Sequence, residues 1–254
     1  MKTANSKKKL HTNELAVSEL ILNLNSKLIE FFGKPRKISK SNPLDILIAT
    51  ILSQNTNDIN SHKAFLSLKS EFPDYNSIIN VSQKKLQNVI KVAGLAQKKC
   101  KTIKNFLTKL EKDKGELSLN FLKKYSNEDA IKFLTSFKGI GVKTASCVLL
   151  FGMNRNVCPV DTHVFRVINR VGIINHYDRD KTFFKLSEIL PKKIAYEFHT
   201  NIIKLGRSIC TSKNPSCNIC PIFEFCSYQK KSKSKQQNVN SKKRNVDFML
   251  LDNV

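Results

Sequence analysis

Apolar side chains recur along this chain at intervals of three and four residues, the spacing of one helix face. The spacing predicts a helix over 14–32, which ends at Gly33-Lys34-Pro35, and one over 42–54, where Asn42-Pro43 is a helix-entry pair. The second is apolar on almost every side and is expected to be buried. No convincing stretch alternates with the period of two that strands show, so about ten helices and an all-α fold are predicted. The other helices are expected over 57–70, 82–91, 96–113, 126–137, 143–151, 162–171, 180–190 and 193–206.

Composition agrees with a helical fold and adds a strong positive charge. Only 8 glycines and 7 prolines occur in 254 residues, and such sparse helix breakers favour helices. The formal net charge is +24, and residues 14–228 alone hold 33 basic against 18 acidic residues. This excess indicates a polyanionic partner, of which nucleic acid is the commonest. A proteome rich in Lys, Asn and Ile would also raise the charge.

Both ends of the chain are basic and poor in apolar residues. Residues 1–13 and 229–254 are therefore expected to be disordered tails. No apolar run reaches the roughly 18 residues that a membrane span needs, and the first residues lack the apolar core of a signal peptide. An intracellular, cytoplasmic protein without membrane contact is expected.

Four of the seven cysteines lie within one short segment, with the spacing C-x6-C-x2-C-x5-C. Disulfides are not expected in a chain without export signals. Four thiolates that close one short loop are typical of a site for zinc or for an iron–sulfur cluster, and the residues alone do not separate these two. The isolated Cys100, Cys147 and Cys158 are expected to be core residues. The clustered four are Cys210, Cys217, Cys220 and Cys226.

The stretch "SFKGIGVKTAS" (136–146) interrupts two predicted helices with Gly139-Ile140-Gly141. A helix, a tight glycine turn and a second helix can present several backbone N–H groups to one phosphate, with Ile140 anchoring the turn. An ordinary helix–helix turn would look the same. Lys143 follows in the first turn of the second helix, where the helix dipole and partial burial would favour the neutral, nucleophilic amine. A contact to phosphate is the simpler role for this lysine.

Asp161 opens the helix predicted over 162–171, in "PVDTHVFRVINR". An aspartate at this place is ordinarily a helix N-cap. The same carboxylate could also stabilise an oxocarbenium-like sugar or relay protons beside an amine nucleophile.

In combination, "FKGIGVKTASCVLLF", "VDTHVFRVINR" and the four cysteines resemble, in order and spacing, the endonuclease III family of DNA base-excision glycosylases. "ILSQNTND" (51–58) and "VAGLAQKKCKTI" (92–103) are also similar to segments of that family, and the resemblance runs from about residue 20 to 228. It implies a helix-hairpin-helix glycosylase fold. A six-helix barrel over 44–154 would stand beside an iron–sulfur cluster domain formed by 14–43 and 155–228.

The resemblance also implies a role for each motif residue. Lys143 matches the lysine that attacks C1′ of the damaged nucleotide and forms a Schiff base, and Asp161 matches the catalytic aspartate. The four cysteines match the ligands of a [4Fe-4S] cluster. Such enzymes excise oxidised pyrimidines from duplex DNA and then cut 3′ to the abasic site by β-elimination. The implied partner is duplex DNA with damaged bases or abasic sites, bound by a monomer associated with the nucleoid.

Extrusion of a nucleotide leaves a gap in the duplex that a side chain must fill. Leu95 matches a leucine wedge of the family, and Gln54 or Asn55 could hydrogen-bond the orphaned base. Leu95 could instead be a core leucine, and Gln54 and Asn55 a helix C-terminal cap. Lys138 stands where the family usually has proline, and the glutamine of "LSQNTND" sits one place early. A monofunctional mismatch glycosylase and a non-catalytic DNA-binding protein are the alternatives.

Overall fold

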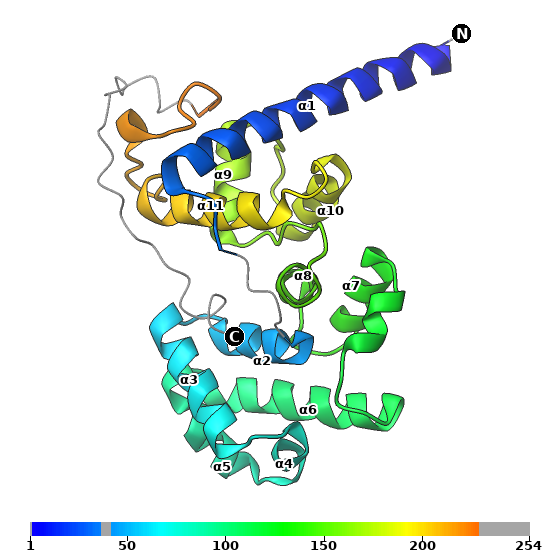
Figure 1. Ribbon diagram of the computed structural model, residues 1–254, viewed down its shortest axis with the longest axis vertical. Helices are drawn as coiled ribbons and strands as arrows, with labels where there is room; N and C mark the ends of the chain where they lie inside the picture. Colours follow the sequence, from blue (N-terminus) through cyan, green and yellow to red (C-terminus); the bar gives the residue numbers. More distant parts are fainter. Residues whose placement is uncertain (1, 37–41, 229–254) are drawn as a thin grey trace. The chain divides into compact units, whose positions relative to one another are not determined.

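The computed structural model describes the backbone of residues 2–36 and 42–228, and their side chains from residue 15 onward (Figure 1). These residues are helical and form no strand, which confirms the all-α prediction. None of the described helices is long and apolar enough to cross a membrane. The α-helices are α1 (Lys2–Phe32), α2 (Pro43–Ser53), α3 (Asp58–Glu71), α4 (Tyr75–Asn80), α5 (Gln83–Ile90), α6 (Ala96–Lys114), α7 (Asn127–Thr135), α8 (Val142–Cys147), α9 (Thr162–Val171), α10 (Arg179–Ile189) and α11 (Ala195–Ser208).

The described residues form two compact units. One is the continuous stretch 42–155, and the other combines 2–36 with 156–228. Their assignment as the six-helix barrel and the cluster domain stays a prediction. The expected tail 229–254 lies outside the described residues. Helix α1 begins at Lys2, so residues 2–13 are helical where a disordered tail was expected. No glycine or proline between Lys2 and Phe32 would stop the helix there.

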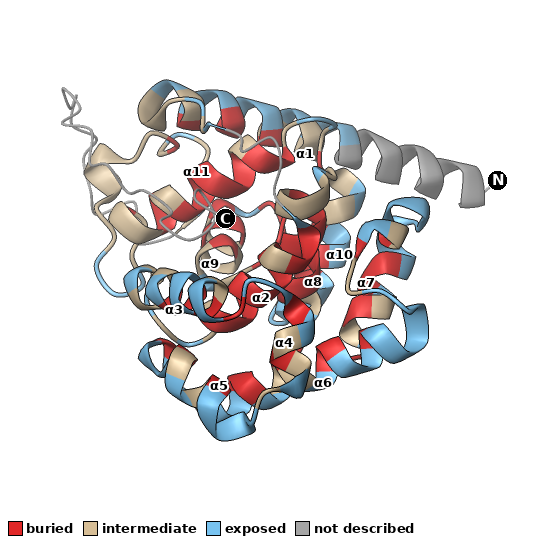
Figure 2. Ribbon diagram, turned by 60° about the horizontal axis from the view of Figure 1, so that its bottom comes forward, coloured by how far each residue is buried: buried red, intermediate tan, exposed pale blue. Residues whose placement is uncertain are grey.

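Helix α2 forms the centre of the continuous unit and packs against α3, α6 and α8. The Asn42 side chain caps its first turn by accepting a hydrogen bond from the Leu44 N–H at 2.9 Å. Nine of its eleven residues are buried, as its apolar sequence predicts (Figure 2). After α8 the chain passes through one π-helical turn, Val148–Gly152. This turn packs closely on α2, because a β-carbon on Gly152 would lie 2.8 Å from Pro43 Cα.

The discontinuous unit is organised around α11, which packs against α1 and α9. Ten of its fourteen residues are buried, and Ile21, Leu24 and Leu28 of α1 are fully buried as well. Helices α9 and α11 cross at Gly206, where a β-carbon would lie 2.8 Å from that of His163. Close packing at this crossing holds the start of α9 firmly.

The hydrophobic pattern failed to predict the short helical segments. Helix α4 and the 3-10 turns Lys91–Ala93, Asn120–Lys124 and Cys217–Ile219 were not predicted. A helix of six residues spans under two turns, so its apolar positions show little periodicity. The capping residue was the available indication, since Asp74 accepts a hydrogen bond from the Ser77 N–H at 2.9 Å.

Candidate functional site

The turn between α7 and α8 requires glycine at its first glycine position. Gly139 has φ +95°, and a β-carbon there would lie only 2.5 Å from Thr102 Oγ1 on α6. The left-handed backbone and the close approach of Thr102 both make a residue with a β-carbon energetically unfavourable at this position. Ile140, next along the chain, is 3% exposed. The expectation that Ile140 anchors the turn in the core is therefore confirmed.

Gly141 differs from Gly139 because the fold makes no such demand on it. It is the N-cap of α8 with φ −96°, and a β-carbon there would meet no atom within 4 Å. Gly141 is exposed, and the first N–H groups of α8 lack acceptors within the helix. A close backbone approach to DNA is thus available at this position. Lys138, which stands in place of the expected proline, is also exposed.

Lys143 is the second residue of α8 and is half-buried. Its carbonyl accepts a hydrogen bond from Ser146 Oγ at 3.0 Å, an ordinary contact within the helix. No described residue forms a hydrogen bond or ion pair with its amine. The amine is therefore available to react with or bind a ligand that approaches the hairpin.

Gln54 ties the end of α2 to the hairpin. Its backbone N–H donates to Ile51 O at 3.2 Å, so it is the C-cap of α2. Its side-chain Nε2 lies 3.2 Å from Gly139 O and 3.3 Å from Thr144 Oγ1. The side chain of Gln54 is therefore committed to holding the glycine turn in place, which leaves Asn55 as the freer of the two amides.

Asn55 and Leu95 share an uncommon backbone conformation and an exposed side chain. Their φ angles are +51° and +49°, in the left-handed region that residues with a β-carbon rarely adopt. Leu95 is 52% exposed, so its interpretation as a core leucine is wrong. Strained residues that persist on a surface are concentrated at functional sites. Both remain candidates to enter the duplex.

A residue that sequence reasoning missed connects the segments before Asn55 and Leu95. Lys99 of α6 is 2% exposed, and its Nζ donates to Leu52 O at 2.7 Å and to Ala93 O at 2.8 Å. Burial lowers the pKa of the Lys99 amine to about 8. One weak indication was present in the sequence, an apolar helical pattern over 96–113 whose buried face includes position 99.

Asp161 lies in the other unit and caps α9, as its sequence context predicts. One carboxylate oxygen, Oδ1, accepts hydrogen bonds from the N–H groups of His163 at 2.9 Å and Val164 at 2.8 Å. The described residues give Oδ2 no hydrogen bond. The carboxylate is thus fixed in orientation by one oxygen while the other stays available for chemistry.

Two arginines of α9 connect this helix to the loop that begins the cysteine segment. Arg166 donates to Gly206 O at 2.8 Å and to Cys210 O at 2.9 Å, and its guanidinium lies 3.1 Å from His163 Nδ1. Arg170 donates to Cys210 Sγ at 3.3 Å and to Thr211 O at 2.7 Å. The helix that positions Asp161 therefore also supports the segment of the first clustered cysteine.

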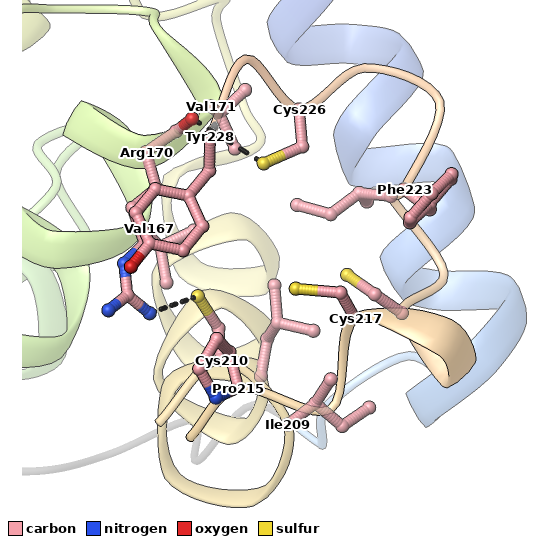
Figure 3. Close-up of a pocket in the computed structure, with 13 residues that line it drawn as sticks. Val167, Arg170, Val171, Ile209, Cys210, Pro215, Cys217, Phe223, Cys226 and Tyr228 are labelled. Atoms are coloured by element: carbon pink, nitrogen blue, oxygen red, sulfur yellow. Dashed lines mark hydrogen bonds between the residues drawn. The ribbon is translucent and has the colours of Figure 1, made fainter. Parts of the chain in front are cut away.

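The four clustered cysteines line one pocket between α9, α11 and the last described segment. Figure 3 shows the sulfur atoms of Cys210, Cys217 and Cys226 facing a common space. Burial raises the pKa of the Cys220 thiol to about 12, a backbone hydrogen bond from Ile222 opposes this, and the other three cysteines add to the rise. A cationic metal centre would offset that cost and release the protons. Among the described residues, no three His, Cys, Asp or Glu side chains are grouped closely enough to hold a single metal ion.

The remaining cysteines are core residues, as predicted. Cys100, Cys147 and Cys158 are each at most 1% exposed, and no disulfide forms among the seven. His199 is also buried, with Nδ1 at 3.8 Å from Cys158 Sγ. These side chains pack the interior and do not line the pocket of the clustered four.

Comparisons with known proteins decide the family. Residues 48–192, more than half of the chain, match the HhH-GPD superfamily of base excision DNA repair proteins. This chain belongs to that superfamily. A protein of Arabidopsis thaliana that is named a DNA glycosylase is 39% identical over 193 residues, which cover 72% of this chain and 66% of the relative. Endonuclease III of Rickettsia conorii is 34% identical over 210 residues, 80% of this chain and 95% of the relative.

A solved structure of endonuclease III agrees with this assignment. A non-covalent complex of endonuclease III with DNA superposes with a TM-score of 0.70 at 25% identity and covers 85% of this chain and 97% of the other. The resemblance to endonuclease III and the helix-hairpin-helix glycosylase fold are thereby confirmed. The protein is a DNA glycosylase of base excision repair.

Proposed function

We propose that this HhH-GPD protein is a bifunctional DNA glycosylase and abasic-site lyase that removes oxidised pyrimidines through a Schiff base at Lys143. The carrying observation is the Lys143 amine, which has no partner among the described residues and stands directly after an anchored glycine turn. Ile140 and Gln54 hold that turn rigid. A nucleophile placed on a rigid element reacts with a bound sugar as an effectively intramolecular group.

The chemistry follows from a neutral amine and an electrophilic sugar carbon. Lys143 Nζ forms a bond to C1′ as the bond from C1′ to the base breaks, and the base leaves with the electron pair and takes up a proton. A proton then moves from nitrogen to O4′ as the C1′–O4′ bond breaks, which opens the sugar ring and gives an imine. Removal of a C2′ proton then expels the 3′ phosphate, and water hydrolyses the imine to release the lysine.

The other predicted residues have complementary roles in this proposal. Gly139 and Gly141 present backbone N–H groups to a DNA phosphate, and Ile140 supports the turn between them because its N–H donates to Phe137 O at 3.1 Å. Asn55 and Leu95 enter the gap that the extruded nucleotide leaves. Asp161, held by Oδ1 alone, stabilises the positive charge that develops on the sugar or moves a proton there. The protein acts as a monomer on duplex DNA with damaged bases or abasic sites.

The pocket of Cys210, Cys217, Cys220 and Cys226 is proposed to hold a [4Fe-4S] cluster. Four thiols that line one pocket fit this group, and its bonds would cross-link four positions of the segment after α11, which Arg166 and Arg170 connect to α9. An absorbance band near 410 nm, with about four iron and four sulfide per chain, would support it. Zinc in place of iron would contradict it.

Borohydride trapping tests the lyase. The protein is incubated with duplex DNA that contains one abasic site, reduced, and analysed for a covalent complex on a denaturing gel. Wild-type protein and Lys138→Ala are expected to give the complex, and Lys143→Ala is not. Lys138 is the matched control because it is an exposed lysine of the same hairpin. A base-releasing wild-type enzyme that gives no trapped complex would instead be a monofunctional glycosylase.

A further inference from the structure

Two surface segments of the continuous unit meet at one buried amine. Lys99 Nζ bridges Leu52 O, in the last turn of α2, and Ala93 O, at the end of the 3-10 turn Lys91–Ala93. The Lys99 backbone N–H also donates to Leu95 O at 3.0 Å. The three contacts connect α6 to the chain immediately before Asn55 and to both sides of Gly94-Leu95.

A cation is physically well suited to this position. Both acceptor carbonyls end helical segments, where the last C=O groups lack partners and the helix dipole is negative. Buried carbonyls without a hydrogen bond destabilise the folded state. The two interactions therefore offset the cost of burying Lys99, which is 2% exposed.

The location of the bridge points to more than stability. Within the described part of the chain, four residues other than glycine have positive φ, and two of them are Asn55 and Leu95. Each lies two or three residues beyond a carbonyl that Lys99 binds. Lys104, five residues later on α6, caps α4 in a similar way through Ile78, Ile79 and Val81. No positive-φ residue follows that second cap within the described α4–α5 segment.

We propose that Lys99 is a positioning residue for nucleotide extrusion, which holds Asn55 and Leu95 as one rigid wedge. The inference rests on the proposed function only in assigning these two residues to the duplex gap. Opening a duplex costs free energy in lost stacking and pairing. If the segments that carry Asn55 and Leu95 moved independently, the duplex could displace them. Because the Lys99 ammonium binds both segments to α6, they resist displacement.

The test compares Lys99→Met with Lys104→Met, which removes a half-buried lysine of the same helix that also caps carbonyl groups. Single-turnover release of 5-hydroxycytosine from duplex DNA reports extrusion of a stacked base. Borohydride trapping on a preformed abasic site reports chemistry that needs no base extrusion. A third readout is the fluorescence of 2-aminopurine placed opposite a tetrahydrofuran abasic analogue, which follows intrusion without any reaction.

Lys99→Met is expected to slow base release by about tenfold to hundredfold while trapping changes by less than about threefold. Its 2-aminopurine signal should fall, and Lys104→Met should match wild type in all three readouts at a similar loss of thermal stability. Equal behaviour of the two variants, or an equal loss of base release and trapping in Lys99→Met, would overturn the proposal.

A second variant keeps the test decisive if Lys99→Met does not fold. The Lys99→Gln side chain is one bond shorter, carries no charge and brings a carbonyl oxygen beside the two acceptors, so it weakens the bridge. It should still show slower base release with normal trapping, and wild-type base release by this variant would overturn the proposal. Absence of trapping by wild-type protein would instead refute the lyase function. Absence of a wild-type 2-aminopurine response would refute the wedge itself.

Discussion

At the scale of single residues, the two hairpin glycines have different reasons to be glycine. Gly139→Ala should lower the free energy of unfolding by about 2 kcal/mol or more, because φ is +95° and Thr102 occupies the β-carbon position. Thermal or urea unfolding measures this loss. A stable Gly139→Ala variant would contradict the geometry of the turn.

Gly141→Ala is the matched substitution with the opposite expectation. Its β-carbon meets no protein atom within 4 Å, so stability should change by less than about 1 kcal/mol. The methyl group would stand between the hairpin backbone and a DNA phosphate, and affinity for duplex DNA should fall. Fluorescence anisotropy with labelled duplex DNA measures the affinity. Unchanged affinity would show that no phosphate approaches Gly141.

Asp161 allows its capping and chemical roles to be separated. Asparagine caps helices about as well as aspartate, so the free energy of unfolding of Asp161→Asn should lie within about 1 kcal/mol of the wild-type value. The substitution removes the charge, and base release should slow by about a hundredfold or more. Stability and single-turnover base release are measured side by side. A fully active Asp161→Asn enzyme would leave Asp161 as a cap alone.

At the scale of elements, α9 has two roles. Asp161 caps its first turn, and Arg170 near its end contacts the cysteine segment. Arg170 donates to Cys210 Sγ, to Thr211 O and to Ser212 O, and its guanidinium lies 4.4 Å from the Tyr228 ring centre. Arg170→Met should therefore reduce the iron retained per chain after purification, measured by absorbance near 410 nm and by iron assay. Lys185→Met on α10, an exposed position, is the control. Equal iron content would separate α9 from the metal centre.

The elements also show how much of the structure could be predicted from the sequence. Helices of two turns or more follow from the periodicity of their apolar residues, and α9 was predicted over its full observed range. The hairpin and the cysteine segment were also found, because each is a local pattern. Lys99 was not, since a buried lysine bonded to carbonyls 47 and 6 residues away looks in sequence like any other lysine. The role of Gln54 in holding the hairpin likewise could not be predicted, because its side chain contacts Gly139, 85 residues away in the sequence.

At the scale of the whole molecule, the charge of +24 predicts affinity for DNA that depends strongly on salt. Each phosphate contact adds about 0.9 to the slope of log K against log salt concentration. Lys138→Ala should reduce the slope by about that amount if the exposed hairpin lysine binds phosphate, whereas Lys185→Ala on α10 should not. Anisotropy titrations between low and moderate salt measure both slopes. Identical slopes would remove Lys138 from the interface.

The discontinuous unit also has a consequence for biosynthesis. Helix α1 leaves the ribosome before its partner α11, which begins only at Ala195. At about 5–20 residues per second, α1 waits roughly 8–30 s with Ile21, Leu24 and Leu28 uncovered. The segment 42–155 can complete its own contacts in that interval. Nascent chains stalled before Ala195 should therefore contain one folded unit and one helix, α1, whose apolar face is exposed. That face is where a holdase chaperone would bind.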